Sequence, residues 1–213
     1  MSRVGRVVLF ALSVVVPLAL ASPSASAVPD RKLGATLGSV WEEVIEIPWP
    51  QNPYNGGDPC IDMGSIVAPL APVGAPDITC TVKPGTRIFV TAESSECSTV
   101  EAAPYFGADE ASLRECARKA DEGFRTPTVS VDGQPVAVTE VETGLLTLDL
   151  PKENIFGVPA QTAYSVAHGW VALLPPLRPG SHVVTIHNVG TDAYGNDVDA
   201  TNSTTILVQP LNR

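Results

Sequence analysis

The sequence predicts a mostly β chain, built as an antiparallel β-sandwich with an N-terminal helix and a disulfide-stapled helical insertion. Short segments with alternating apolar residues recur from residue 127 onward, and turn residues separate them. Twenty prolines and 17 glycines are spread over 213 residues, which disfavours an all-helical chain. Four cysteines, an even number, are typical of disulfide bonds in an exported protein.

The first 27 residues have the pattern of a secretory signal peptide. Arg3 and Arg6 precede an apolar run over residues 7–21, and Ala25-Ser26-Ala27 supplies a cleavage site with small residues. A membrane anchor is the alternative, but the run is shorter than the roughly 20 residues that a spanning helix needs. We therefore expect cleavage after Ala27, secretion to the extracellular space without a membrane span, and a single domain over residues 28–213.

The chain is acidic, with 13 basic and 23 acidic residues and a net charge of −10. Loss of the predicted signal peptide removes two arginines and no acid, so the mature chain carries −12. This balance excludes nucleic acid as a partner, because a nucleic-acid binder needs a basic surface to meet phosphate. It favours solubility, and it is also compatible with a cationic partner or Ca²⁺.

The four cysteines are Cys60, Cys80, Cys97 and Cys116, which allow three pairings. We favour Cys60–Cys80 and Cys97–Cys116, because each bond closes a loop of about 20 residues and the two loops do not overlap. A zinc site is the disfavoured alternative, since the sequence has no Cys-x-x-Cys and no histidine close to a cysteine.

The first half of the mature chain predicts two helices and three short strands. Apolar residues at three- and four-residue spacing predict an amphipathic helix that Pro48 ends: Leu37, Val40, Trp41, Val44 and Ile45. Residues 66–68, 78–82 and 87–92 are β-branched and predict strands. Residues 93–125 are predicted as an excursion from the sheets that contains the helical insertion around 109–122, with Asp109 as its N-cap.

The second half predicts a series of strands. Asp132-Gly133 is a hairpin turn between alternating segments, and Leu146, Leu148 and Leu150 alternate in the next strand. A longer strand then places five residues on one face: Tyr164, Val166, His168, Trp170 and Ala172. Residues 182–187 and 204–208 complete the predicted sandwich.

Two segments near the C-terminus carry a resemblance. Residues 169–186, with Pro179-Gly180 before an alternating strand, and the turn Thr191-Asp192-Ala193-Tyr194-Gly195-Asn196 resemble the late strands of bacterial immunoglobulin-like modules. The likeness covers roughly residues 145–209 and implies an immunoglobulin-like antiparallel β-sandwich.

The whole layout also resembles a family of uncharacterised exported bacterial proteins. The matching features are Trp41, Cys80-Thr81-Val82, Glu96-Cys97-Ser98 and residues 174–182. This resemblance implies a fold and an exported location, and no activity.

Tyr164, His168 and Trp170 are the candidate ligand-binding residues. A row of aromatic and imidazole groups on one strand face can bind the flat faces of sugar rings, although core packing explains the same pattern. Of the other two histidines, His182 occupies the place of a corner residue that bonds back to the backbone, and His187 is expected to be exposed.

Two weaker candidates are acidic. Glu93 and Glu96 are paired carboxyl groups of the kind that hydrolyse glycosidic bonds, with plain solvation in a polar loop as the alternative. A possible Ca²⁺ site combines four oxygen-bearing side chains in one turn: Asp192, Asn196, Asp197 and Asp199. Capping of the turn by its own Asp and Asn side chains explains that cluster equally.

The sequence thus favours an exported, non-enzymatic module with no cofactor, which binds a polysaccharide or a protein of the cell wall or extracellular space. A secreted hydrolase that acts on polysaccharide is the alternative. A structural spacer or an inhibitor-like protein is a third class.

Overall fold

The computed structural model describes residues 30–70 and 77–210, and the predicted signal peptide lies outside this part of the chain. The first half contains α1 (Asp30–Glu46), η1 (Trp49–Gln51), η2 (Pro53–Asn55), β1 (Cys60–Asp62), β2 (Ile66–Pro69), β3 (Ile78–Val82), β4 (Arg87–Ser98) and α2 (Glu110–Asp121). The second half contains β5 (Thr128–Val131), β6 (Gln134–Val136), β7 (Thr139–Glu142), β8 (Leu146–Leu150), β9 (Gln161–Leu174), β10 (Gly180–Thr191) and β11 (Asp197–Val208). The prediction of a mostly β chain is confirmed.

The strands form two sheets. One sheet has the order β1-β2-β4-β9-β7, with β8 continuing along the same edge of β9 as β7, and the other has the order β3-β11-β10-β5-β6. Most neighbours are antiparallel, but β2 runs parallel to β4, and β3 runs parallel to β11. Both sheets are therefore mixed, which departs from the purely antiparallel arrangement that the sequence predicts.

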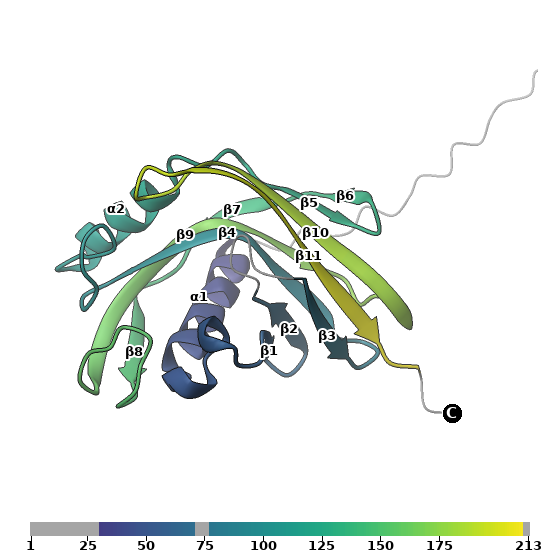
Figure 1. Ribbon diagram of the computed structural model, residues 1–213, viewed down its shortest axis with the longest axis horizontal. Helices are drawn as coiled ribbons and strands as arrows, with labels where there is room; N and C mark the ends of the chain where they lie inside the picture. Colours follow the sequence, from purple (N-terminus) through teal and green to yellow (C-terminus); the bar gives the residue numbers. More distant parts are fainter. Residues whose placement is uncertain (1–29, 71–76, 211–213) are drawn as a thin grey trace, which may run out of the picture.

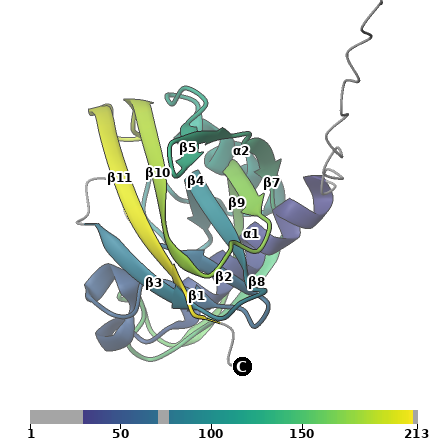
Figure 2. The same ribbon diagram turned by 90° about the vertical axis from the view of Figure 1, so that its right-hand side faces the viewer.

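The molecule has three layers. The β10–β11 hairpin lies over one face of the β4–β9 pair, and α1 lies under the other face (Figure 1). Between the sheets, the core includes Val90, Leu174, Val184 and Ile206. Figure 2 shows the same layers from the side, with α1 crossing behind the long strands.

Helix α1 packs on the β4–β9 pair through its apolar stripe. Leu37 and Val44 contact a buried cluster that contains Phe89 and Val171. Gly34 permits this close approach, because a Cβ there would lie 2.5 Å from the carbonyl oxygen of Glu142. The helix begins at Asp30, earlier than the predicted apolar stripe. The glycines in this first part lower its helix propensity, but they allow the close packing.

Strand β9 has two differently covered faces, as its alternation predicts. Val166 belongs to a cluster with Leu113 and Ala117 of α2, whereas Ala167 and Val171 belong to the cluster with α1. Because successive side chains of a strand point to opposite faces, His168 and Trp170 lie on the same side of β9 as Val166. The β4–β9 pair is thus enclosed by one helix on each face.

Two disulfides connect these layers. Cys60–Cys80 joins β1 of one sheet to β3 of the other, and Cys97–Cys116 joins β4 to α2. The structure therefore has the sequential pairing that the loop lengths favour.

Helix α2 begins at the predicted N-cap. The Asp109 side chain accepts a hydrogen bond from Ser112 N, and Ser112 Oγ accepts one from Asp109 N, which completes a capping box. The apolar stripe of α2 faces β4 and β9, where Leu113 and Ala117 are fully buried. The capping box thus fixes the N-terminal end of α2, and the disulfide fixes its middle against β4.

The prediction that the chain leaves the sheets at residue 93 is wrong for residues 93–98. They continue β4 as far as Ser98 and do not begin an excursion from the sheets. The backbone of this polar segment pairs with β9 from Glu93 to Ser98, which keeps it in the sheet. Within the described residues, no helix has the length and apolar character that crossing a membrane requires.

Candidate ligand-binding site

The centre of the candidate site is His168, which lies between two carboxylates. Its Nδ1 is 2.9 Å from Asp121 Oδ2, and its Nε2 is 3.2 Å from Glu140 Oε1. Asp121 is the last residue of α2 and is completely buried, whereas the side chain of Glu140 on β7 is 60% exposed. One ring nitrogen therefore faces the interior and the other faces the solvent.

The position of Asp121 explains why it needs this partner. An acid at the C-terminal end of a helix is opposed by the helix dipole, and burial removes the water that would otherwise stabilise its charge. The second oxygen, Asp121 Oδ1, has no hydrogen-bond partner among the described residues. The contact with His168 is thus the main compensation for a buried negative charge.

The two carboxylates also change the protonation of His168. Burial acts to lower the pKa of the imidazole, but the hydrogen bond and charge of Asp121, together with Glu140, outweigh burial and raise the pKa. The imidazolium form has two N–H donors, so it satisfies both carboxylates at once.

Trp170 follows two residues later on the same face of β9. Its ring meets the His168 ring edge to face, with centroids 5.7 Å apart and planes at 79°. The residue between them is Gly169. A larger residue would not fit there, because a Cβ would lie 2.2 Å from the carbonyl oxygen of Glu93 at the β-bulge of β4. In the register of β4 and β9, Glu93 lies opposite Trp170.

His168 and Trp170 line an open pocket of about 570 Å³ between α2, β7 and β9, which we name the His168 pocket. The remaining lining residues are mostly charged, with one further aromatic side chain: Glu115, Arg118, Lys119, Asp121, Glu122, Phe124 and Glu140. The pocket therefore combines two aromatic side chains, of which Trp170 is only 9% exposed, with hydrogen-bonding groups of both charges.

An ion-pair network fixes the α2 wall of this pocket. Glu142 on β7 accepts hydrogen bonds from Arg118 at 2.6 Å and from Arg114 at 2.5 Å, and Arg114 also pairs with Glu110. Burial acts to raise the pKa of Glu142, but the two guanidinium groups lower it overall. Arg118 is thus paired with Glu142 within the protein. Lys119 is the other basic side chain of α2 that lines the pocket.

The structure brings together only two of the three predicted ligand-binding residues. Tyr164 shares the face of His168 and Trp170 but is 47% exposed and lines none of the cavities described for the molecule. Between Tyr164 and His168, Val166 lies under α2. The three side chains therefore do not form one continuous platform.

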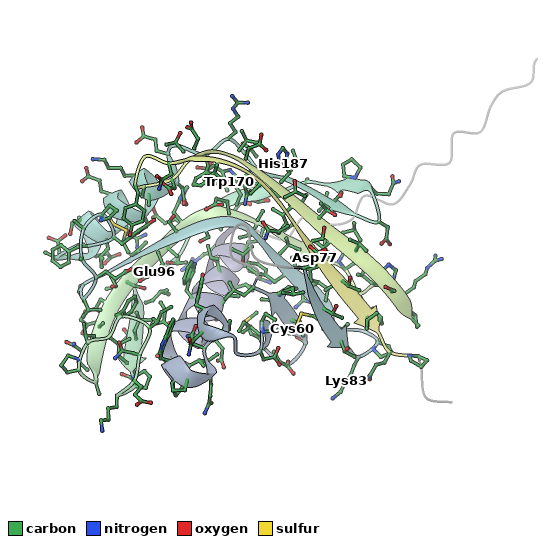
Figure 3. All side chains as sticks on the ribbon, viewed as in Figure 1. Cys60, Asp77, Lys83, Glu96, Trp170 and His187 are labelled. Carbon is green, nitrogen blue, oxygen red and sulfur yellow. A yellow bond between two sulfur atoms is a disulfide. The ribbon has the colours of Figure 1, made fainter. Side chains whose placement is uncertain are left out.

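The two acidic candidates, Glu93 and Glu96, lie in β4 and not in a polar loop. Cys97 is bonded to α2, so strand alternation places Glu93 on the α2 face and Glu96 on the α1 face. Figure 3 shows Glu96 below the β4–β9 pair, on the side of α1, and Trp170 above it. Glu96 is only 6% exposed, so the interpretation of these acids as solvated loop residues is wrong for Glu96.

Burial changes the protonation of both acids. Glu93 lines a second cavity of about 220 Å³, and burial followed by the charge of Asp121 raises its pKa to about 7. For Glu96, burial and the neighbouring Glu101 raise the pKa well above the ordinary value. Glu101 itself accepts a hydrogen bond from Ser98 Oγ at 2.9 Å.

The other two histidines have structural partners. His182 Nε2 lies 2.9 Å from the carbonyl oxygen of Arg178, and its Nδ1 lies 2.7 Å from Asp132 Oδ2. This bond back to the preceding backbone is the kind of contact expected of a corner residue. His187 Nε2 lies 2.8 Å from Asp199 at the surface.

At the proposed calcium turn, the structure shows capping by side chains. Asp192 Oδ1 accepts hydrogen bonds from the backbone N–H groups of Tyr194 and Asn196, and Asp192 Oδ2 accepts one from Asn196 Nδ2. Asp197 begins β11, and Asp199 contacts His187. Across residues 30–70 and 77–210, no group of three or more His, Cys, Asp or Glu side chains is arranged to hold a metal ion.

Sequence reasoning missed Asp121 and Glu140. They lie 47 and 28 residues from His168 in the chain, in a helix and in a short edge strand. One signal was available, because Asp121 is an acid at the end of a helix whose other terminal residues, Arg118 and Lys119, are basic.

Comparisons with known proteins add little to this geometry. No protein-family model matches the chain, and no curated protein matches it. Among solved structures, the solution structure of Amebosin matches with 12% sequence identity and a TM-score of 0.21, over 62% of this chain and 88% of that one. A TM-score this low supports no conclusion about fold or function.

Proposed function

We propose that the protein is an exported, non-enzymatic binding module that takes a saccharide of the cell wall or extracellular space in the His168 pocket. The observation that carries the proposal is the pocket itself, where Trp170 and Phe124 lie among charged hydrogen-bonding groups. Sugar rings offer apolar faces to aromatic side chains and hydroxyl groups to carboxylates and bases. The proposal includes an immunoglobulin-like ancestry for β10 and β11, on the turn and strand motifs of residues 169–196.

Two further observations support an exported location. Both disulfides are of the kind that persists in oxidising compartments, and the N-terminal segment has the pattern of a signal peptide. In such a protein the His168 pocket opens directly to extracellular polymers.

Retention on insoluble cell-wall and polysaccharide matrices tests the proposal. We expect the wild-type protein to be retained and Trp170→Ala, with an unchanged circular dichroism spectrum, to lose at least about tenfold in affinity, because stacking on an aromatic ring is a major part of such binding. Tyr164→Ala is the matched control, since it removes an exposed aromatic ring of the same strand outside the pocket. Equal retention of Trp170→Ala and wild type would contradict the proposal.

A secreted hydrolase that acts on polysaccharide is the second candidate, and Glu93 favours it. A carboxyl group with a pKa of about 7, lining a cavity, suits a general acid at neutral pH. Because Glu96 lies on the other face of β4, Glu93 would need a different partner, and Asp121 is near enough to raise its pKa. Turnover of a glycan panel that survives Glu93→Gln combined with Glu96→Gln would remove this candidate.

A further inference from the structure

The cavity at Glu93 is separate from the His168 pocket and has its own chemistry. It lies beside the edge of β4, between α1 and the β10–β11 hairpin, and we name it the Glu93 cavity. Trp41, Leu70 and Ile186 form an apolar part of its lining. Glu93 and Asn188 are among the polar residues that line it.

Asn188 shows that the cavity has an unmet hydrogen bond. Its side chain is only 3% exposed, and Nδ2 donates to the carbonyl oxygen of Ala92 at 3.0 Å, which fixes the orientation of the amide. Asn188 Oδ1 is then left as a buried acceptor with no hydrogen-bond partner among the described residues. Thr91 Oγ1, in the same lining, is also buried without one. Buried acceptors of this kind are costly unless a donor reaches them.

The electrostatic surroundings of the cavity are negative. The lining residues that the structure describes include Glu93 and no lysine, arginine or histidine. Glu93 also faces the carboxylate of Asp121 from α2. The pKa of Tyr54 from η2 is raised to about 12, first by burial and then by the charges of Glu93 and Glu96. The imidazole of His168, which faces Asp121, is already bonded to that carboxylate.

We propose that the Glu93 cavity binds a small organic cation, a protonated amine attached to an apolar group. The ammonium group supplies the N–H donors that Asn188 Oδ1 and the Glu93 carboxylate accept, and its charge offsets the surrounding carboxylates. The apolar part of the ligand packs on Leu70, Ile186 and the Trp41 ring, which also attracts a cation through its π face. The net charge of the chain, −10, draws cations toward it.

Three probes of nearly the same shape test the charge of the ligand: benzylamine, benzyl alcohol and benzoate. In isothermal titration calorimetry at pH 8, we expect benzylamine to bind and the alcohol to bind at least about tenfold more weakly, since a hydrogen bond to a charged partner separates them. Benzoate should show no binding. Equal binding of benzylamine and benzyl alcohol, or no binding of benzylamine at millimolar concentration, would overturn the proposal, and water would then be the natural partner of Asn188.

Two further measurements tie the ligand to Glu93. Glu93→Gln should weaken benzylamine binding at pH 8 by about tenfold or more, whereas Glu140→Gln, which changes only the His168 pocket, should leave it unchanged. In the wild type, affinity should rise about tenfold from pH 6 to pH 8, because Glu93, whose pKa is about 7, loses its proton. His168, which contacts Asp121 and has a raised pKa, loses positive charge as the pH rises, and this acts in the same direction. This pH series needs no variant, so it tests the role of Glu93 even if Glu93→Gln does not fold. An affinity that does not change between pH 6 and pH 8 would contradict that role.

Discussion

On the α2 side of the β4–β9 pair, the buried carboxylate of Asp121 has an imidazole partner. On the α1 side, the buried carboxyl of Glu96 has another carboxyl, Glu101, as its neighbour. At the first site Asp121 and Glu140 raise the pKa of His168 against the effect of burial. At the second site burial and then Glu101 raise the pKa of Glu96, and burial raises the pKa of Glu101 although its contact with Glu96 lowers it. Burial is common to the two sites, and the partner either opposes its effect, as at His168, or adds to it, as at Glu96.

Of the variants considered, His168→Ala should change stability most. His168→Ala leaves Asp121 buried at a helix C-terminus with no cation, so we expect it to lower the free energy of unfolding at pH 7 by about 3–5 kcal/mol. Urea denaturation measures this loss.

His182 provides a matched control for that experiment. It also pairs with an aspartate, Asp132, but this aspartate is exposed at a turn, so His182→Ala should cost less than His168→Ala. Adding Asp121→Asn to His168→Ala should recover part of the loss, because the pair is coupled. Equal losses in the two histidine variants would show that burial of Asp121 contributes little.

Glu93 adds a third, half-buried acid to these two, on the α2 face of β4, and its pKa of about 7 lies near neutral pH. The pKa of Glu93 in the folded protein, about 7, is above the ordinary value of 4.5, so the folded state holds a proton that the unfolded state releases. Stability from this group is complete below pH 4.5 and declines as the pH rises to about 7. The shift corresponds to about 3 kcal/mol.

The variant Glu93→Gln isolates this contribution. His168 has a raised pKa and also loses stabilisation as the pH rises above 6.5, so the wild-type curve contains both effects. The difference between wild type and Glu93→Gln should therefore change by about 3 kcal/mol in favour of the variant from pH 4.5 to pH 8. Parallel curves from urea denaturation at each pH would show that Glu93 has an ordinary pKa in the folded state.

The sequence predicted β9 and its faces well but missed the partners across the molecule. Alternation alone places His168 and Trp170 on one face, because side chains two residues apart in a strand point to the same side. Asp121 comes from a helix that is distant in the chain, and no local period links it to β9. The sequence predicts that residues 93–125 leave the sheets, because the polar residues 93–98 show no apolar alternation. Only the tertiary structure shows that pairing with β9 keeps residues 93–98 in β4.

The smallest expected effect concerns Glu140, the exposed partner of His168. Because its side chain is 60% exposed, Glu140→Gln should change the free energy of unfolding by less than about 1 kcal/mol. The pKa of His168, followed by NMR titration of the imidazole, should nevertheless fall, and it should fall less than in Asp121→Asn. A larger fall in Glu140→Gln would mean that the solvent-facing carboxylate, and not the buried one, controls the charge of His168, and the contrast between the two faces would then rest on exposure instead of on the partner.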